Sequence, residues 1–427
     1  MWDVSRRSAL VAGASLVAVS LGMATPGQAE TTVTLWSHWA DHDSKVAFVE
    51  EAARAFEADH PDVKVEITWY QKEPLYAALK TALRAGQGPD IFYSEPDQIE
   101  YIENHLLHDL SADLSWDSIE DWAKEVWTFN GGVYGFPLEA WTVEMYYDKA
   151  KLAALGFELP GSGQFSQSEF LEVVAKARAE GITPIALGVG DRPYPGAFLA
   201  HEALLKSLGK EDYDRLLRGE LSWDDPRVHA ALGFVEQLVE AGALPESFSS
   251  LKLGESHVYF HTNPGSLMFL MGSFYPSRAF NPPDKAGQPE DFALGIMKYP
   301  ALDGAACNEC KTITVGGSYS VNAASPHPEL AVALLNVMAT PEMGNKWLET
   351  VLVQTGIGTD PDKITGPNAA YFQELAGINA DADYYIGLPM QVLQGQAREV
   401  FQQVVNEAFP AGLIGPDEVI AQMNGTQ

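Results

Sequence analysis

The chain is poor in cysteine and in basic residues. Its 427 residues include two cysteines, Cys307 and Cys310, and 27 Lys and Arg against 58 Asp and Glu, for a formal net charge of -31. Proteins bind nucleic acids and anionic membranes through basic surfaces, so this negative net charge argues against nucleic acid as a partner. Two thiols cannot complete a four-thiolate zinc site. In an oxidising compartment, the pair would instead form one small disulfide in a tight loop.

Long apolar runs and common catalytic motifs are also missing after residue 30. No later segment approaches the roughly 20 apolar residues of a transmembrane helix. The glycine-rich nucleotide motifs, H-E-x-x-H and G-x-S-x-G do not occur, which removes the usual signals of nucleotide binding, zinc proteolysis and serine hydrolysis. An enzyme would have to rest on carboxylate pairs, such as Glu95 with Asp97 or Glu139 with Glu144, as in a glycosidase. We expect no cofactor and no catalytic activity.

The first 29 residues have the pattern of an export signal. Ser5-Arg6-Arg7 precedes an apolar run, and Gly27-Gln28-Ala29 forms a small-x-small cleavage site. We predict export by the twin-arginine route, cleavage near Ala29 and a periplasmic mature protein. Because Ala9 stands where this pattern usually has Phe, Sec export of the same segment is the alternative.

The mature chain is long enough for two domains, because about 400 residues exceed the usual limit of one apolar core. Its beginning alternates between strand and helix patterns. Residues 33–36, 63–69 and 91–93 are expected to be strands, and helices are expected after Asp43 or Ser44, which would cap the first, and over residues 75–85. Such a β-α-β-α-β order predicts a parallel sheet.

A parallel sheet of this kind binds ligands beyond the carboxyl ends of its strands, where the strand order reverses. If the first strand is central, the loops after the first and third strands flank this point. These loops carry Ser37, His38 and Trp39, and Glu95 and Asp97. The sequence therefore predicts a cleft at these residues.

The rest of the chain also alternates between helix and strand patterns. We expect a strand over residues 182–187. Further helices are expected over residues 168–179, 196–208, 227–241, 327–338 and 388–408.

Motifs spread over the mature chain resemble the extracellular solute-binding proteins of ABC importers, in the carbohydrate-binding group that includes maltose-binding protein. Each motif is weak alone, but their order and spacing are specific. They are Val33-Thr34-Leu35-Trp36, Gly88-Pro89-Asp90-Ile91, Gly132-Val133-Tyr134-Gly135-Phe136-Pro137, Tyr146-Tyr147-Asp148-Lys149, Gly181-Ile182-Thr183-Pro184, Met271-Gly272-Ser273-Phe274-Tyr275-Pro276 and Gly316-Gly317-Ser318-Tyr319.

This resemblance implies a two-lobe α/β periplasmic-binding-protein fold with a ligand cleft between the lobes and a hinge near Phe136 to Leu138. One lobe would comprise residues 31–137 and 299–342, and the other residues 138–298 and 343–427. It also implies a non-enzymatic receptor, monomeric, which carries a sugar or oligosaccharide to an inner-membrane ABC permease.

Mapped by motif, the resemblance implies cleft positions at Trp39, Asp97, Glu139, Trp141, Tyr194, Phe274, Tyr275 and Gly317. Aromatic rings stack on the C-H faces of sugars, while carboxylates and amides bond their hydroxyls, so this mixture suits carbohydrate.

Two arginines near these positions leave the charge of the ligand undecided. Arg192 and Arg278 would either grip a carboxylate or sulfonate on a modified sugar or pair with nearby acids. Tyr385, in a tyrosine pair that resembles those of exported ferric-ion binders, would line the cleft. A metal ion is therefore an alternative ligand. A polyamine is a further alternative.

Overall fold

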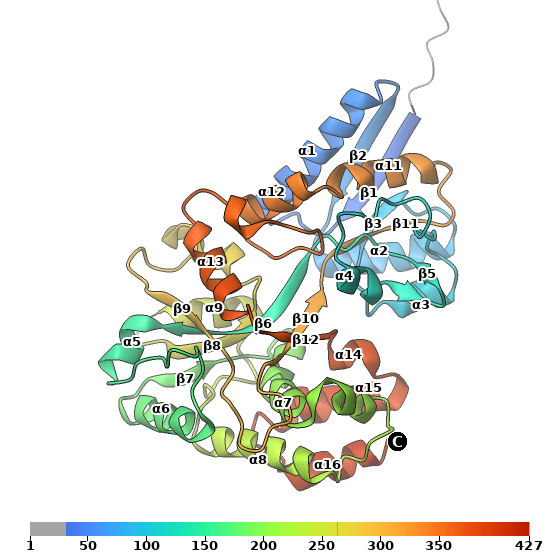
Figure 1. The fold of residues 1–427 in the computed structure, drawn as a ribbon. Coiled ribbons are helices and arrows are strands. Elements are labelled where there is room, and N and C mark those ends of the chain that lie inside the picture. Colours follow the sequence, from blue (N-terminus) through green and yellow to red (C-terminus); the bar gives the residue numbers. More distant parts are fainter. Residues whose placement is uncertain (1–30, 263, 427) are drawn as a thin grey trace, which may run out of the picture.

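The computed structural model describes residues 31–262 and 264–426, except for the side chains of Tyr194 and Pro361. The predicted export signal, residues 1–29, lies outside this part. The described chain forms two α/β lobes, drawn one above the other in Figure 1. None of the helices in these ranges combines the length and the apolar character needed to cross a bilayer.

The first lobe is built on a four-stranded sheet with the order β11-β3-β1-β2. β1 runs parallel to β2 and β3, and β11 runs antiparallel to β3. The predicted β-α-β-α-β unit is confirmed, and its first strand lies between the other two. The strands are β1 (Thr31–Ser37), β2 (Val63–Trp69), β3 (Ile91–Ser94) and β11 (Ser318–Val321).

The helices of this lobe contribute buried apolar residues to its core. α1 begins at Asp43 without a side-chain cap, so the expected capping role of Asp43 or Ser44 is wrong. The Asp43 carboxylate instead lies in the first turn, where the helix dipole favours negative charge. The helices are α1 (Asp43–Asp59), α2 (Lys72–Arg84), α3 (Ile99–Glu103), α4 (Asp121–Val126), α11 (Pro328–Met338) and α12 (Pro341–Val351), and the hairpin β4 (Thr128–Phe129) with β5 (Gly132–Val133) lies beside α4.

The second lobe contains a mixed sheet with the order β12-β10-β6-β8-β7, and β9 pairs with the far half of β6. β6 is buried along its whole length, and it pairs with β8 on one edge and with β10 and β9 on the other. The strands are β6 (Ala140–Asp148), β7 (Thr183–Ala186), β8 (Ser266–Gly272), β9 (Leu294–Met297), β10 (Cys310–Val315) and β12 (Asp383–Ile386).

The helices expected over residues 168–179, 196–208 and 227–241 are confirmed as α6, α7 and α8, although α7 continues to Leu217. The single helix expected over 388–408 is wrong, because Leu393 adopts extended backbone and Gly395 a positive φ, which split it. The helices are α5 (Lys149–Ala154), α6 (Gln167–Ala179), η1 (Tyr194–Ala197), α7 (Phe198–Leu217), α8 (Pro226–Glu240), α9 (Leu253–His261), α10 (Pro276–Ala279), η2 (Pro283–Lys285), η3 (Pro361–Lys363), α13 (Ala369–Ile378), α14 (Pro389–Val392), α15 (Gly395–Phe401), the π-helical η4 (Gln402–Ala408) and α16 (Pro416–Asn424).

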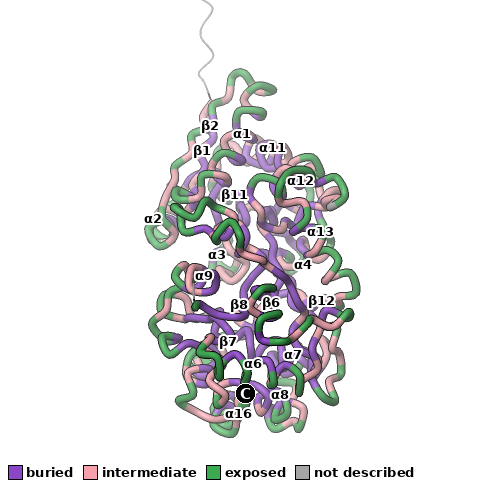
Figure 2. Tube along the Cα trace, turned by 90° about the vertical axis from the view of Figure 1, so that its left-hand side faces the viewer, coloured by how far each residue is buried: buried purple, intermediate pink, exposed green. Residues whose placement is uncertain are grey.

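Each lobe has its own apolar core, and in Figure 2 the buried segments follow the strands of both. The cores divide the chain differently from the expected boundaries at two places. Tyr299 and Cys310 pack in the second core, because β10 pairs with β6. Trp347 and Val351 pack in the first core, because α12 lies on α1. We therefore propose residues 31–138 and 316–358 as the first lobe.

Three crossing segments join the lobes and hydrogen-bond to one another. The Glu139 amide donates to the Gly317 carbonyl at 2.8 Å, and the Gly316 amide donates to the Glu139 carbonyl at 2.8 Å. The Ala140 amide donates to the Gln354 carbonyl at 2.9 Å. The hinge expected near Phe136 to Leu138 adjoins these contacts, which tie the two lobes together at one place.

Glu144 of β6 carries a fully buried carboxylate in the second lobe. It accepts hydrogen bonds from Lys311 at 2.6 Å and from Asn379 at 2.9 Å. Replacing Lys311 with Met should lower the free energy of unfolding by about 3 to 5 kcal/mol, because a buried charge loses its counter-ion. Denaturant titration measures this loss. The exposed control Lys80→Met should change stability by less than about 0.5 kcal/mol, and a loss below about 1 kcal/mol in Lys311→Met would contradict the prediction.

Candidate functional site

A cleft of about 530 Å³ lies between the lobes. This volume falls within the range of small-molecule sites. The first lobe and the crossing after β10 contribute His38, Trp39, His42, Lys45, Lys72, Glu73, Tyr76, Tyr93, Glu95, Pro96, Asp97, Val315, Gly316 and Gly317. The second lobe and the start of β6 contribute Glu139, Trp141, Arg192, Pro193, Leu253, Phe274, Ser277, Arg278, Leu388, Met390, Gln391, Arg398, Gln402 and Asn406.

The loops after β1 and β3 form one wall of this cleft, as strand order predicts. His38 and Trp39 follow β1, and Glu95 and Asp97 follow the neighbouring β3. The carboxyl ends of these parallel strands meet at the same sheet edge, where neighbouring β11 runs in the opposite direction. Gly317 borders the same place, and a Cβ there would lie 2.7 Å from a Tyr93 ring carbon, so only glycine fits.

The aromatic residues of the cleft differ in how much surface they offer. Trp39 is 1% exposed, because its ring packs against Tyr319 and Trp347. Trp141 is 7% exposed and meets Phe274 edge to face at 5.5 Å between centroids. Phe274 itself is only partly buried. Phe274 is therefore the most accessible of the three rings. Trp141 packs against it, and Trp39 is almost completely covered.

Every carboxylate that lines the cleft lies beside a cation. Two of these ion pairs connect the lobes: Arg192 with Glu73 at 2.9 Å, and Arg398 with Asp97 at 3.1 Å. The other two are Lys45 with Glu139, a residue of the crossing segment itself, at 2.5 Å, and Lys72 with Glu95 within the first lobe at 2.7 Å. Of the two alternatives for Arg192, the structure therefore shows pairing with a nearby acid, Glu73. Arg278, the other arginine that the sequence singles out, also lines the cleft.

Glu95 is held in its ionised form. Burial raises the pKa of its carboxyl group, but the charge of Lys72 and hydrogen bonds from Lys72 and Tyr76 outweigh this effect and lower the pKa to about 2. Tyr93 donates a third hydrogen bond at 2.9 Å. Because its pKa is low, Glu95 is a poor proton donor at neutral pH. The neighbouring Asp97 differs, since burial raises its pKa and the charge of Glu95 raises it further.

Both histidines of the cleft are neutral at physiological pH. Burial, followed by the charges of Lys72 and Lys45, lowers the pKa of His38 to about 2. Burial, followed by the charge of Lys45, lowers the pKa of His42 to about 4. Neutral imidazoles add hydrogen-bonding atoms to the cleft without adding charge.

Four expected site residues do not have described side chains in the cleft. Ser37 accepts a hydrogen bond from Tyr319 within the first core. Tyr275 is fully buried, since its ring packs against Phe260 and Phe269. Tyr385 packs against Tyr213 of α7. The side chain of Tyr194 lies outside the described part of the chain.

Sequence reasoning missed several lining residues. Lys45 and Lys72 lie in the first turns of α1 and α2, directly after the loops of β1 and β2, so the same topological rule could have found them. Arg398, Gln402 and Asn406 could not be found in this way, because their place depends on the break before α15.

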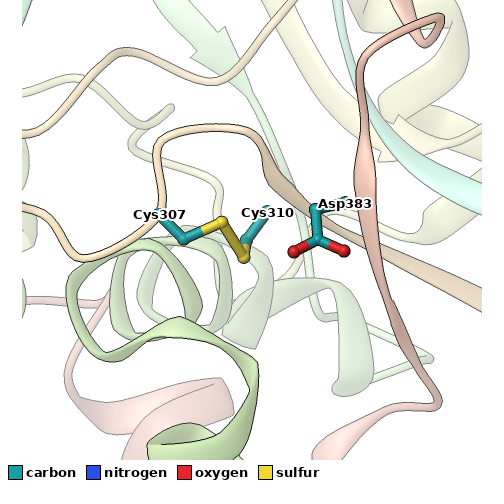
Figure 3. A group of neighbouring side chains, drawn as sticks. All are labelled: Cys307, Cys310 and Asp383. Carbon is teal, nitrogen blue, oxygen red and sulfur yellow. A yellow bond between two sulfur atoms is a disulfide. The ribbon is translucent and has the colours of Figure 1, made fainter.

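A second group of ligand-type atoms lies outside the cleft. Cys307 and Cys310 form the expected disulfide, and Asp383 lies beside it (Figure 3). Among residues 31–262 and 264–426, these three side chains form a group whose possible metal-ligand atoms lie close together. Sulfurs joined in a disulfide are not thiolates, and Asp383 already pairs with Lys210. We therefore assign this group a structural role.

Replacing Lys72 with Met should raise the pKa of Glu95 from about 2 toward or above its ordinary value, because burial then outweighs the remaining hydrogen bonds. Carbon-13 NMR of the Glu95 carboxyl group would detect the change as a titration between about pH 3.5 and 6 that the original protein lacks. Lys80→Met serves as the control. A Glu95 that still shows no titration in this interval would contradict the assigned role of Lys72.

Comparisons with known proteins place the chain in a family. The sequence profile of the family described as bacterial extracellular solute-binding protein matches residues 39–345. An uncharacterized ABC transporter extracellular-binding protein of Pyrococcus horikoshii is 25% identical over 254 residues, 55% of this chain and 56% of that protein. A lactose-binding protein of Rhizobium radiobacter is 26% identical over 197 residues, 44% of this chain and 46% of that protein. The matches therefore span about half the length of these relatives.

Solved structures agree on the fold. A structure described as a chitin oligosaccharide binding protein matches with a TM-score of 0.76 and 19% identity, over 92% of this chain and 98% of that one. At this identity the match speaks for the fold alone, and it confirms the two-lobe α/β architecture. Since the family profile covers well over half of the residues and agrees with the motifs in the sequence, the chain belongs to the bacterial extracellular solute-binding proteins.

Proposed function

We propose that this protein is the receptor of an ABC importer, which captures a sugar or oligosaccharide between its lobes and delivers it to an inner-membrane permease. The observation that carries the proposal is the cleft of about 530 Å³ with lining residues from both lobes. The proposal includes export to the periplasm, with cleavage near Ala29, and action as a monomer. The names of the relatives, which include a lactose-binding protein and an ABC transporter binding protein, support it.

Carbohydrate suits the lining of the cleft. Phe274 offers a ring face for the C-H side of a sugar, and Trp141 holds that ring edge to face. His38, Gln391 and Gln402 add neutral polar groups. Such groups bond hydroxyls without requiring a charged ligand.

Ligand capture would work by shifting the balance between open and closed lobes. A ligand that contacts both walls stabilises the closed form, whereas one that touches a single lobe shifts nothing, however tightly it binds. Arg192 with Glu73 and Arg398 with Asp97 already connect the walls. The crossing segments at Glu139, Gly316 and Gln354 supply the pivot.

The alternatives suit the cleft less well. A polyamine needs free carboxylates, but each carboxylate of the lining pairs with a protein cation. A metal ion prefers the same free oxygen atoms. A glycosidase needs a carboxylic acid that stays protonated near neutral pH. Glu95 is instead ionised down to about pH 2, and Asp97, although burial raises its pKa, forms an ion pair with Arg398. We therefore propose that the chain binds its ligand without altering it.

Calorimetric titration of residues 30–427 against mono-, di- and oligosaccharides tests the receptor function. We expect saturable binding of one class at one site per chain, with the ligand recovered unchanged. Cleavage of the ligand would favour the glycosidase. Silence toward all carbohydrates, with binding of a metal ion or a polyamine, would overturn the proposal.

Phe274→Ala should weaken sugar binding by roughly tenfold, because the stacking ring is lost. Phe280→Ala is a matched control, since Phe280 is also partly buried but packs against Tyr371 outside the cleft. Calorimetry and thermal unfolding separate the effects: both variants should lose some stability, but only the first should lose affinity. Equal affinity in the two variants would remove Phe274 from the site.

The affinity for a sugar that does not itself titrate should stay constant between about pH 6.5 and 8. Burial lowers the pKa of His38 to about 2 and that of His42 to about 4, so neither imidazole gains a proton in this interval. Titrations at three pH values measure this. A tenfold change in affinity across the interval would contradict the prediction.

A further inference from the structure

The cleft holds one cation more than its carboxylates can neutralise. Its four acidic residues form four ion pairs, with Lys45, Lys72, Arg192 and Arg398. Arg278 is the fifth cation of the lining, and among the described residues its guanidinium takes part in no ion pair or side-chain hydrogen bond. The lining therefore carries a surplus positive charge within a chain whose formal net charge is -31.

Building on the receptor function above, we propose that the ligand is a sugar bearing one negatively charged group, a carboxylate or a sulfonate, and that Arg278 binds this group. A guanidinium presents two parallel N-H donors that match the oxygens of such a group. Its charge is permanent, so the pairing holds at all physiological pH values.

Arg278 lies where a bound anion could contact both lobes. It belongs to α10 of the second lobe, which follows β8 and also carries the lining residue Ser277. Its charge adds to the effect of burial and Lys45 in lowering the pKa of His42, a residue of the first lobe. The guanidinium is therefore close enough to the first lobe for its field to act there. A group held by Arg278 would bias the lobes toward the closed form.

A second observation indicates that the ligand also carries a hydroxyl or another donor. Asn406 is a lining residue of the cleft that is 1% exposed, and its side-chain oxygen is buried and has no hydrogen-bond partner within the described residues. A buried acceptor without a partner is costly, and a donor on the ligand would satisfy it. It lies in the π-helical turn η4, a geometry that often occurs at functional sites.

The number of free cations limits the charge of the ligand. One guanidinium balances one negative charge, so a carboxylate or a sulfonate fits better than a phosphate monoester, which carries nearly two charges at neutral pH. The acidic surface of the molecule repels anions. Only a ligand whose charge meets Arg278 would offset this repulsion.

Calorimetric titration of the mature protein with matched pairs tests the proposal. The pairs are glucose with glucuronate, galactose with galacturonate, and glucose with 6-deoxy-6-sulfoglucose, together with the corresponding disaccharides, and glucose 6-phosphate serves as the dianion. We expect at least one monoanionic sugar to bind about tenfold or more tightly than its neutral parent and than the phosphate.

Variants then assign the effect to Arg278. Arg278→Gln should weaken binding of the acidic sugar by roughly 10- to 100-fold, because a charge-assisted pair is lost, and should leave the neutral parent within about twofold. Arg278→Lys should restore part of the affinity. Arg218→Gln removes the same charge from an exposed arginine outside the cleft and should change neither. Equal thermal unfolding midpoints of Arg278→Gln and the original protein would exclude misfolding.

The outcomes separate this proposal from the receptor function. Neutral sugars that bind as tightly as their acids would overturn the role of Arg278 and leave the receptor function intact. The same holds if Arg278→Gln weakens acidic and neutral sugars equally. Silence toward every carbohydrate, acidic or neutral, would remove both proposals together.

Discussion

The small set of backbone hydrogen bonds among the three crossing segments is the constraint on which the rest of this molecule depends. Glu139, Gly316 with Gly317, and Gln354 belong to segments far apart in the sequence, yet they bond to one another at one place. Each lobe has a separate core, so this junction sets where the cleft walls face each other. Glu139 also lines the cleft, so the junction between the lobes and the wall of the cleft share this residue.

Local pattern and strand order predict much of the first lobe, because strands and helices alternate there with clear periodicity and short connections. The same rule puts His38, Trp39, Glu95 and Asp97 at the cleft, although it could not foresee that Trp39 would be packed under its neighbours. This rule could not predict the ion pairs of the cleft, because Arg192 and Glu73 belong to different lobes and meet only where the two lobes face each other. The residues of α15 and η4 escaped prediction because a local change of backbone at Leu393 redirects the chain.

Charge is arranged in the cleft so that few groups remain free for a ligand. The ionised carboxylates accept hydrogen bonds from protein cations, and the histidines are neutral because burial disfavours their charged form. A ligand therefore meets ring surfaces, neutral polar atoms and the groups that lack a partner. Specificity in such a site rests on the few unsatisfied atoms, since leaving them unpaired penalises every wrong ligand.

The two ion pairs that span the cleft have a consequence for the empty protein. Arg192 with Glu73 and Arg398 with Asp97 lie in partly exposed positions, where dissolved ions weaken attraction. Opening the lobes would separate both pairs at once. In the proposed receptor, the balance between open and closed lobes would therefore depend on the ionic strength of the surroundings as well as on the sequence. A change in environmental salinity would then alter how readily the cleft admits even an uncharged solute.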